Sequence, residues 1–102
     1  MRVISLEEFN DLVIENKKTV LIDFFASWCG PCKMLTPILE EVEKEKNNDV
    51  EIYKVDVDQS FDLAKSYGVM SVPTLILFKN GAEAQRVIGL KSKDFISEMI
   101  KK

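Results

Sequence analysis

Cys29 and Cys32, the two cysteines of this 102-residue sequence, lie three positions apart and are its strongest candidates for chemistry. At this spacing two thiols can close a small disulfide ring or stand open as a dithiol. The nearly continuous apolar run 19–26 predicts a buried strand before the pair, and helical spacing of apolar residues predicts a helix over 32–46 after it. The amides and partial positive charge at a helix N-terminus favour a thiolate. We therefore expect Cys29 to be the reactive, more exposed sulfur and Cys32 the more sheltered one.

The residues around the pair favour redox chemistry over the other uses of this spacing. Half of a metal site and two buried structural cysteines are the alternatives for the bare spacing. The sequence contains no histidine and no third cysteine, so one chain cannot supply the four ligands of a usual zinc or iron–sulfur site. A dimer that bridges a metal through four cysteines remains as an alternative. Trp28 before the pair and Gly30-Pro31 within it, at a strand-to-helix junction, favour the redox interpretation.

Asp23 interrupts the apolar run six residues before Cys29. Aspartate is rarely buried without a partner, and burial raises the pKa of a carboxyl group. We interpret Asp23 as a buried carboxyl that relays the proton of Cys32 through water; the alternative is an exposed position at a strand edge. Lys54, in the alternating segment 51–57, could face Asp23 from a neighbouring strand and modulate its ionisation. The alternative for Lys54 is an ordinary exposed lysine.

Pro73 directly precedes the apolar strand predicted over 74–78. A cis bond between Val72 and Pro73 would leave a backbone carbonyl and amide free at the end of the sheet. The alternative is a trans proline that simply begins the strand.

Length and composition limit the class of protein. A chain of 102 residues predicts one domain over 1–102, and 46% hydrophobic with 30% charged residues argues against disorder. A net charge of −3 gives no electrostatic footprint for nucleic acid. No apolar run approaches the ~18 residues of a membrane span, and the N-terminus lacks the apolar stretch of a secretion signal. We therefore expect a protein of the reducing cytoplasm.

The order of predicted elements indicates an α/β fold. Ser5 and Glu8 have capping-box spacing and predict a helix that buries Leu6, Phe9 and Val13. Asn80-Gly81 predicts a hairpin. The expected order is β-α-β-α-β-α-β-β-α, with parallel pairing first and antiparallel pairing at one end. The further elements are strands over 51–57, 74–78 and 84–88, a helix over 61–67 and a final helix from Ser92; inward positions include Met34 in the helix over 32–46 and Phe95 in the final helix.

Four segments, at 20–33, 54–59, 67–81 and 87–94, resemble the thioredoxin family of the WCGPC type with conventional spacing. The resemblance implies a thioredoxin fold, with a central five-stranded mixed sheet flanked by four helices and a cis bond before Pro73. It implies a thiol–disulfide oxidoreductase that reduces client proteins, with no cofactor beyond its redox-active cysteines. It also implies a flavin- and NADPH-dependent thioredoxin reductase as partner, and a monomer is the plain expectation.

Residue by residue, the resemblance makes Cys29 the attacking nucleophile, Cys32 the resolving thiol, Asp23 the buried acid, Lys54 its neighbour and Pro73 the cis-proline that faces the sulfurs. It further implies a flat apolar surface for extended substrate segments, made of Trp28, Gly30, Pro31, Val57, Met70, Val72, Ile88 and Gly89. Phe25 stands where many members have tryptophan, so a ring is kept and the indole N–H is lost.

Two rival functions follow from the same residues. An oxidase or isomerase of similar fold is disfavoured because Gly30-Pro31 places no charge between the cysteines. A non-catalytic, thioredoxin-like subunit that binds a partner through the surface around Trp28 is disfavoured because binding alone requires neither cysteine.

Overall fold

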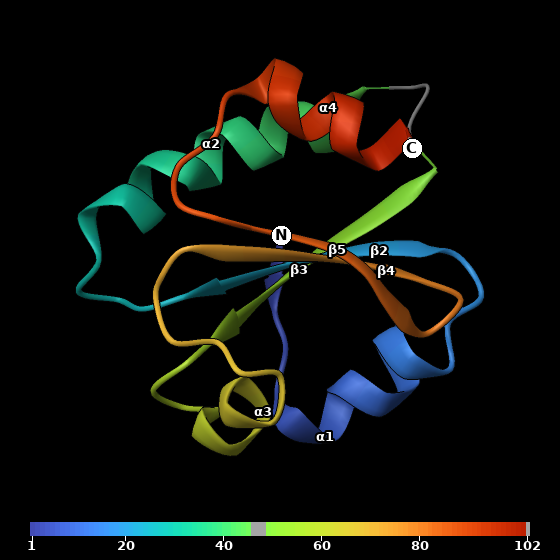
Figure 1. Cartoon of the computed structure of the whole chain (residues 1–102), viewed down its shortest axis with the longest axis vertical. Helices are drawn as coiled ribbons and strands as arrows, with labels where there is room; N and C mark the ends of the chain where they lie inside the picture. The colour runs from blue at the N-terminus through green and yellow to red at the C-terminus, as the bar shows by residue number, and fades with distance from the viewer. Residues whose placement is uncertain (46–48, 102) are drawn as a thin grey trace.

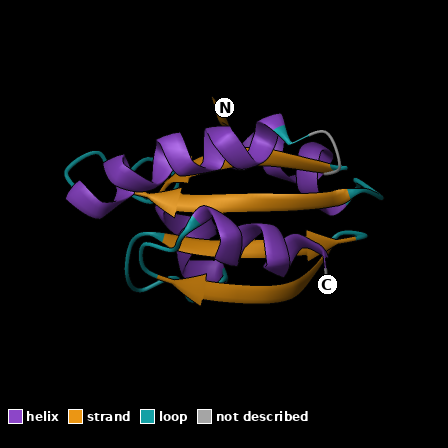
Figure 2. Cartoon of the chain, turned by 90° about the horizontal axis from the view of Figure 1, so that it is seen from above, coloured by secondary structure: helices purple, strands orange, loops and turns teal. Residues whose placement is uncertain are grey.

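The computed structural model describes residues 1–45 and 49–101, and there a five-stranded sheet lies between helices on both faces (Figures 1 and 2). The strands are β1 Arg2–Val3, β2 Thr19–Phe25, β3 Val50–Asp56, β4 Thr74–Lys79 and β5 Ala82–Ile88. The helices are α1 Leu6–Phe9, which continues into the π-helical turn η1 Asn10–Ile14, then α2 Gly30–Lys44, α3 Phe61–Ser66 and α4 Lys93–Lys101. The predicted order of elements is confirmed. The helix expected over 32–46 ends at Lys44, and residue 46 lies outside the described residues.

The strand order is β1-β3-β2-β4-β5, so β2 lies in the middle of the sheet. β1 and β2 pair with β3 in parallel, whereas β4 pairs antiparallel with both β2 and β5. A central strand covered on both faces needs apolar side chains on both, which explains the continuous apolar run of β2. Residues 20–24 of β2 are all buried.

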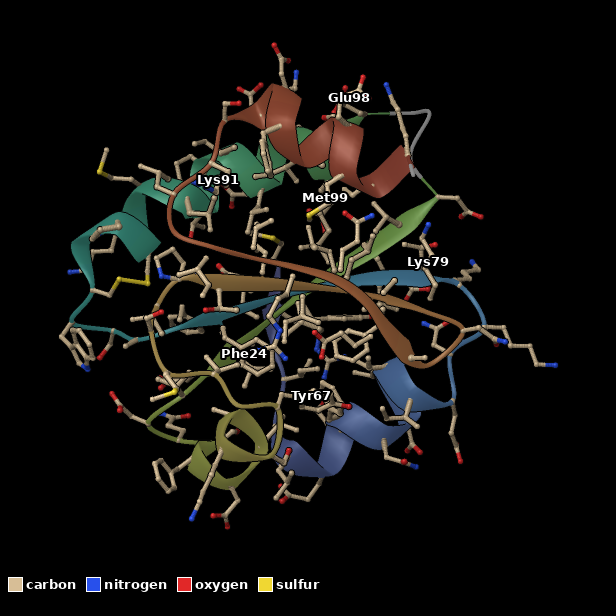
Figure 3. The ribbon with its side chains drawn as sticks, viewed as in Figure 1. Phe24, Tyr67, Lys79, Lys91, Glu98 and Met99 are labelled. Atoms are coloured by element: carbon tan, nitrogen blue, oxygen red, sulfur yellow. A yellow bond between two sulfur atoms is a disulfide. The ribbon has the colours of Figure 1, made fainter. Side chains whose placement is uncertain are left out.

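Successive side chains of β2 point to opposite faces of the sheet and divide the core in two. Val20, Ile22 and Phe24 pack on the α1 and α3 side, whereas Leu21 packs on the α2 and α4 side. In Figure 3, Phe24 and Tyr67 lie on the first side and Met99 on the second. By the same alternation, Asp23 shares the face of Leu21 and points toward α2.

The predictions that Met34 of α2 and Phe95 of α4 face the core are wrong. Met34 is 60% exposed and Phe95 is 46% exposed. Each lies next to the residue that does face the sheet, Leu35 in α2 and Ile96 in α4, and one position is a turn of about 100° around a helix. Spacing alone therefore predicts a buried helix face that is one residue too wide.

The first helix begins as predicted but buries fewer residues. The Glu8 N–H donates to Ser5 Oγ at 3.2 Å, and the Ser5 N–H donates to Glu8 Oε1 at 3.0 Å, so the capping box is confirmed. Phe9 and Val13 are buried, whereas Leu6 occupies the first helical position and is exposed.

The predicted Asn80-Gly81 hairpin joins β4 to β5 and packs on the end of η1. Both residues have positive φ, 53° and 80°, as a type I′ turn requires. A Cβ at Gly81 would overlap the carbonyl oxygen of Ile14, so glycine is needed there for space as well as for conformation.

Gly81→Ala should lower the free energy of unfolding by at least about 2 kcal/mol more than Gly68→Ala does. Gly68 also has positive φ, 66°, but no described atom lies within 4 Å of its added Cβ, so only the conformational cost of about 1 kcal/mol applies. Urea unfolding of both variants measures the difference. Equal losses would contradict the close approach of Gly81 to Ile14.

Candidate active site

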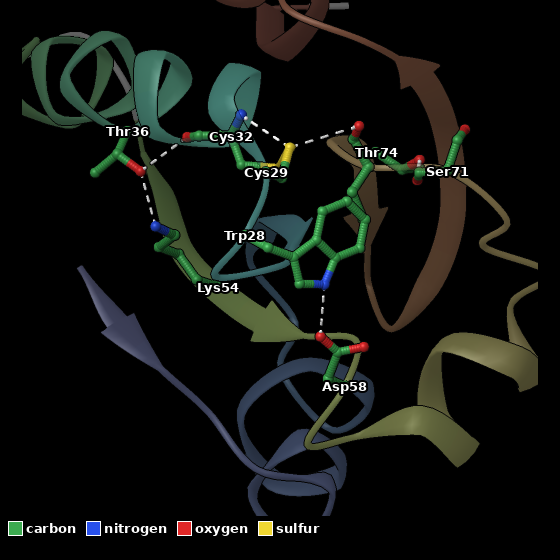
Figure 4. Close-up of a disulfide and its surroundings, with 9 residues drawn as sticks. Trp28, Cys29, Cys32, Thr36, Lys54, Asp58, Ser71 and Thr74 are labelled. Atoms are coloured by element: carbon green, nitrogen blue, oxygen red, sulfur yellow. Dashed lines mark hydrogen bonds between the residues drawn. A yellow bond between two sulfur atoms is a disulfide. The ribbon is translucent and has the colours of Figure 1, made fainter.

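The cysteine pair lies where β2 gives way to α2. β2 ends at Phe25, and Cys29 is the N-cap residue of α2. Cys29 and Cys32 form a disulfide with Cα atoms 5.3 Å apart (Figure 4). The junction follows the carboxyl end of β2, which is the edge of an open α/β sheet where binding sites form.

The sulfur of Cys29 takes the place of a capping oxygen at the start of α2. The Cys32 N–H donates to Cys29 Sγ at 3.2 Å. Negative charge at this sulfur lies at the positive end of the helix dipole, so the geometry favours a thiolate once the disulfide is reduced. Both cysteines are almost buried, at 5% and 2% exposure for Cys29 and Cys32. The expected difference in exposure has the right order but is small.

The loop before β4 forms the wall opposite the disulfide. The Val72-Pro73 bond is cis, as expected, and the Val72 carbonyl oxygen lies 3.8 Å from Cys29 Sγ. The Gly89 N–H donates to the Pro73 carbonyl at 2.8 Å, and Thr74 Oγ1 donates to the Ser71 carbonyl at 2.7 Å. The first bond joins the loop to the end of β5, and the second closes the loop on itself.

A groove of about 500 Å³ opens beside this wall. The Trp28 indole at its edge is 70% exposed and donates from Nε1 to Asp58 Oδ2 at 2.9 Å (Figure 4). Of the surface expected from the resemblance, Trp28, Val57, Met70 and Val72 line the groove. Phe61 and Lys65 also line it and were not predicted; a large apolar residue at the exposed start of a helix is the signal that could have identified Phe61.

The remaining residues of the expected surface lie at the start of α2 or beside the loop of Pro73. Ile88 is exposed at the end of β5, and Gly89 bonds to the loop of Pro73. Pro31 is in the first turn of α2, and no described atom lies within 4 Å of a Cβ built on Gly30. The structure thus leaves open space on the approach to the disulfide.

Asp23 is completely buried, so the alternative of an exposed strand edge is wrong. Neither carboxyl oxygen has a hydrogen-bond partner among the described residues. Burial raises the pKa of Asp23 to about 7, against the opposing effect of the positive charge of Lys54. A carboxyl with this pKa can accept or release a proton near neutral pH.

Lys54 lies directly beside Asp23 in the register of β2 and β3. Its Nζ donates to Thr36 Oγ1 at 2.7 Å and lies 4.3 Å from the centre of the Phe25 ring. Lys54 is partly buried and held by these two contacts, so it is not an ordinary exposed lysine. The ring retained at position 25 serves as a platform for the ammonium. Thr36 was not predicted, although its spacing of four residues from Cys32 places it one turn along the same face.

The described residues hold no cluster of three or more histidine, cysteine, aspartate or glutamate side chains that could bind a metal ion. Nor does any helix in the described part of the chain have the length and apolar character to cross a membrane. The reactive groups that the site does present are the two sulfurs, the Asp23 carboxyl and the Lys54 ammonium.

An α/β domain with a cysteine pair closing at the start of a helix, opposite a cis-proline, defines a class of thiol–disulfide oxidoreductases. The family model for thioredoxin matches residues 1–102. The thioredoxin of Chlamydia caviae is 53% identical over 100 residues, which are 98% of this chain and 95% of the relative. That of Chlamydia trachomatis is 52% identical over 102 residues, 100% of this chain and 97% of the relative. The chain belongs to the thioredoxin family.

The structural comparison agrees. A solved mutant thioredoxin from Halobacterium salinarum superposes with a TM-score of 0.89 at 40% identity, over 99% of this chain and 87% of the other. The family, the fold and the protein-disulfide reductase activity expected from the sequence are confirmed. The family acts on disulfide-containing substrates and depends on a reductase.

Asp23→Asn should stabilise the oxidised protein increasingly as pH rises. The carboxyl ionises near pH 4 in the unfolded chain but at about 7 in the folded one, so folding takes up a proton between these values. The free energy of unfolding of the parent therefore decreases as the pH rises from about 4 to about 7. The variant lacks this decrease because its amide does not ionise. The gap between variant and parent should widen by roughly 4 kcal/mol over this range.

Urea unfolding of the oxidised proteins from about pH 4 to about pH 8 measures the gap, with exposed Asp11→Asn as the matched control. A gap that does not change with pH would contradict the burial of an ionisable Asp23.

Proposed function

We propose that Cys29 is the nucleophile and Cys32 the resolving thiol in the reduction of client disulfides. The Cys29 thiolate attacks one client sulfur, the client S–S bond breaks, and the other client sulfur leaves as a thiolate that takes up a proton. Cys32 then attacks Cys29 Sγ, releases the second client thiol and leaves the Cys29–Cys32 disulfide. Two electrons pass from the protein to the client. The observation that carries this assignment is Cys29 at the N-cap of α2, where its sulfur accepts the Cys32 N–H.

Asp23 accepts the proton of Cys32, through water, as the second step begins. The proposal is supported by the burial of the carboxyl on the face toward α2. It is also supported by the two carboxyl oxygens, which accept no hydrogen bond from any described residue. The pKa of Asp23, raised by burial to about 7, suits a general base at neutral pH. Lys54 modulates this base as its strand neighbour, and Pro73 shapes the wall opposite the sulfurs.

Client segments bind in extended form beside Cys29. Support comes from the Val72 carbonyl oxygen, which lies next to Cys29 Sγ and can pair with a client backbone, and from the exposed apolar side chains of Trp28, Met70 and Ile88. Shape and main-chain bonds then contribute more to recognition than individual client side chains. The proposed surface is Trp28, Gly30, Pro31, Val57, Met70, Val72, Ile88 and Gly89.

The protein works as a reductant that a flavin- and NADPH-dependent thioredoxin reductase recharges. Gly30 and Pro31 add no positive charge at the start of α2, so the dithiol form is only moderately stabilised and gives up its electrons readily. A single domain acting as a monomer in the cytoplasm fits this role, because a reducing compartment keeps the cysteine pair reduced.

Cys29→Ser and Cys32→Ser separate the two steps. Cys29→Ser should abolish the ability of the protein to catalyse insulin reduction with dithiothreitol as electron source, because the attacking thiolate is lost. Cys32→Ser should still attack but fail to release the client, so a mixed disulfide with Cys29 should accumulate and be seen by mass spectrometry. Normal turnover by either variant, or trapping through Cys32 in Cys29→Ser, would contradict the assignment.

A further inference from the structure

One hydroxyl connects the helix of the disulfide to the lysine of β3. Thr36 Oγ1 donates to the Cys32 carbonyl oxygen at 3.3 Å and accepts from Lys54 Nζ at 2.7 Å (Figure 4). Because Thr36 lies one helical turn after Cys32, its hydroxyl can reach that carbonyl without leaving the helix. The donor and an acceptor site of the hydroxyl are thus both in use.

Lys54 is held by α2 and by a ring rather than by the carboxyl beside it. Its Nζ lies over Phe25, and a free lysine side chain would otherwise sample many rotamers. Strand register places Lys54 beside Asp23, yet neither oxygen of Asp23 has a hydrogen-bond partner among the described residues. Lys54 therefore acts on Asp23 through its electric field and not through a direct bond.

These contacts surround a hollow of about 270 Å³ next to the resolving cysteine. Cys32, Thr36, Phe25 and Lys54 all line it, together with Lys33 at the start of α2. The position of the Lys54 ammonium in this hollow sets the strength of its electrostatic interaction with Asp23, because water screens the charge once the ammonium moves into solvent.

We propose that Thr36 is a positioning residue whose hydroxyl holds the Lys54 ammonium against α2 and so sets how strongly that charge favours ionised Asp23. The proposal rests on the proposed function, in which Asp23 takes the proton of Cys32. It gives the hydroxyl at position 36 a role in the chemistry although it touches no reacting atom.

Of the charged groups near Asp23, Lys54 is the one that Thr36 contacts directly. β3 contributes Lys54 and β4 contributes the apolar Leu75 as register partners of Asp23, and α2 contributes Cys32 and Lys33 to the hollow that Lys54 lines. Among the described residues, Lys54 is the charged group that lowers the pKa of Asp23 against the effect of burial. An ammonium released from Thr36 into water lowers that pKa less, so loss of the hydroxyl should raise the pKa of Asp23.

Thr36→Val replaces the hydroxyl by a methyl group of nearly the same size, and Thr36→Ser keeps a hydroxyl. Titration of the Asp23 carboxyl by carbon NMR in the oxidised protein, where the cysteines do not titrate, measures the effect. Thr36→Val should raise the midpoint by about half a pH unit or more, and Thr36→Ser should leave it close to that of the parent. An unchanged or lowered midpoint in Thr36→Val would overturn the proposal.

A double-mutant cycle with Lys54→Met tests whether Thr36 acts through Lys54. In the Lys54→Met background, Thr36→Val should no longer shift the Asp23 midpoint. The same shift in both backgrounds would mean that the threonine acts through packing alone, and would overturn the proposal.

Failure of the proposed function gives a different result. The release of the second thiol from a chromogenic aromatic disulfide follows the resolving step, and its pH profile should move with the Asp23 midpoint in Thr36→Val. A shifted midpoint with an unmoved profile would support the role of Thr36 and contradict Asp23 as the acceptor of the Cys32 proton.

Discussion

The hydrogen bond from the Cys32 amide to the sulfur of Cys29 is the contact on which the proposed function depends. It exists because the buried strand β2 ends just before α2, so that the first sulfur occupies the capping position of the helix. The same hydrogen bond and helix dipole that stabilise the start of α2 then favour negative charge on Cys29 Sγ. The sheet, the helix on it and the reactivity of the sulfur thus form one arrangement.

Asp23 illustrates what this arrangement demands of the core. A carboxyl in the middle strand, on the face that carries Leu21, Leu75 and Leu77, opposes folding whenever it is ionised. Apolar clusters on both faces of the sheet offset that unfavourable term. Burial raises the pKa of the carboxyl to about 7, and Lys54, the neighbour of Asp23 in β3, is held by Thr36 and Phe25.

Features encoded by neighbouring residues could be predicted from the sequence. The apolar run around Asp23 predicted its burial, Asn80-Gly81 predicted the hairpin, and Ser5 with Glu8 predicted the first helix start. The resemblance supplied the cis bond before Pro73, which base rates alone would have argued against. The sequence therefore predicts both the chemistry and the overall fold.

Features that depend on distant packing were not. Helical spacing predicts that Met34 and Phe95 face the core, but both are exposed, because spacing does not define the width of a buried face. The bond of Thr36 to Lys54 joins residues 18 positions apart in a helix and a strand, and only the packing of α2 on β3 brings them together. Phe61 likewise became part of the groove only through the placement of α3 beside Trp28.

Selective alkylation of the reduced protein tests most directly whether the start of α2 activates one sulfur. With a limiting amount of iodoacetamide near neutral pH, Cys29 should be modified at least about tenfold more than Cys32, as located by fragmentation of the peptide that carries both. Equal labelling, or a preference for Cys32, would contradict activation of Cys29 by the helix.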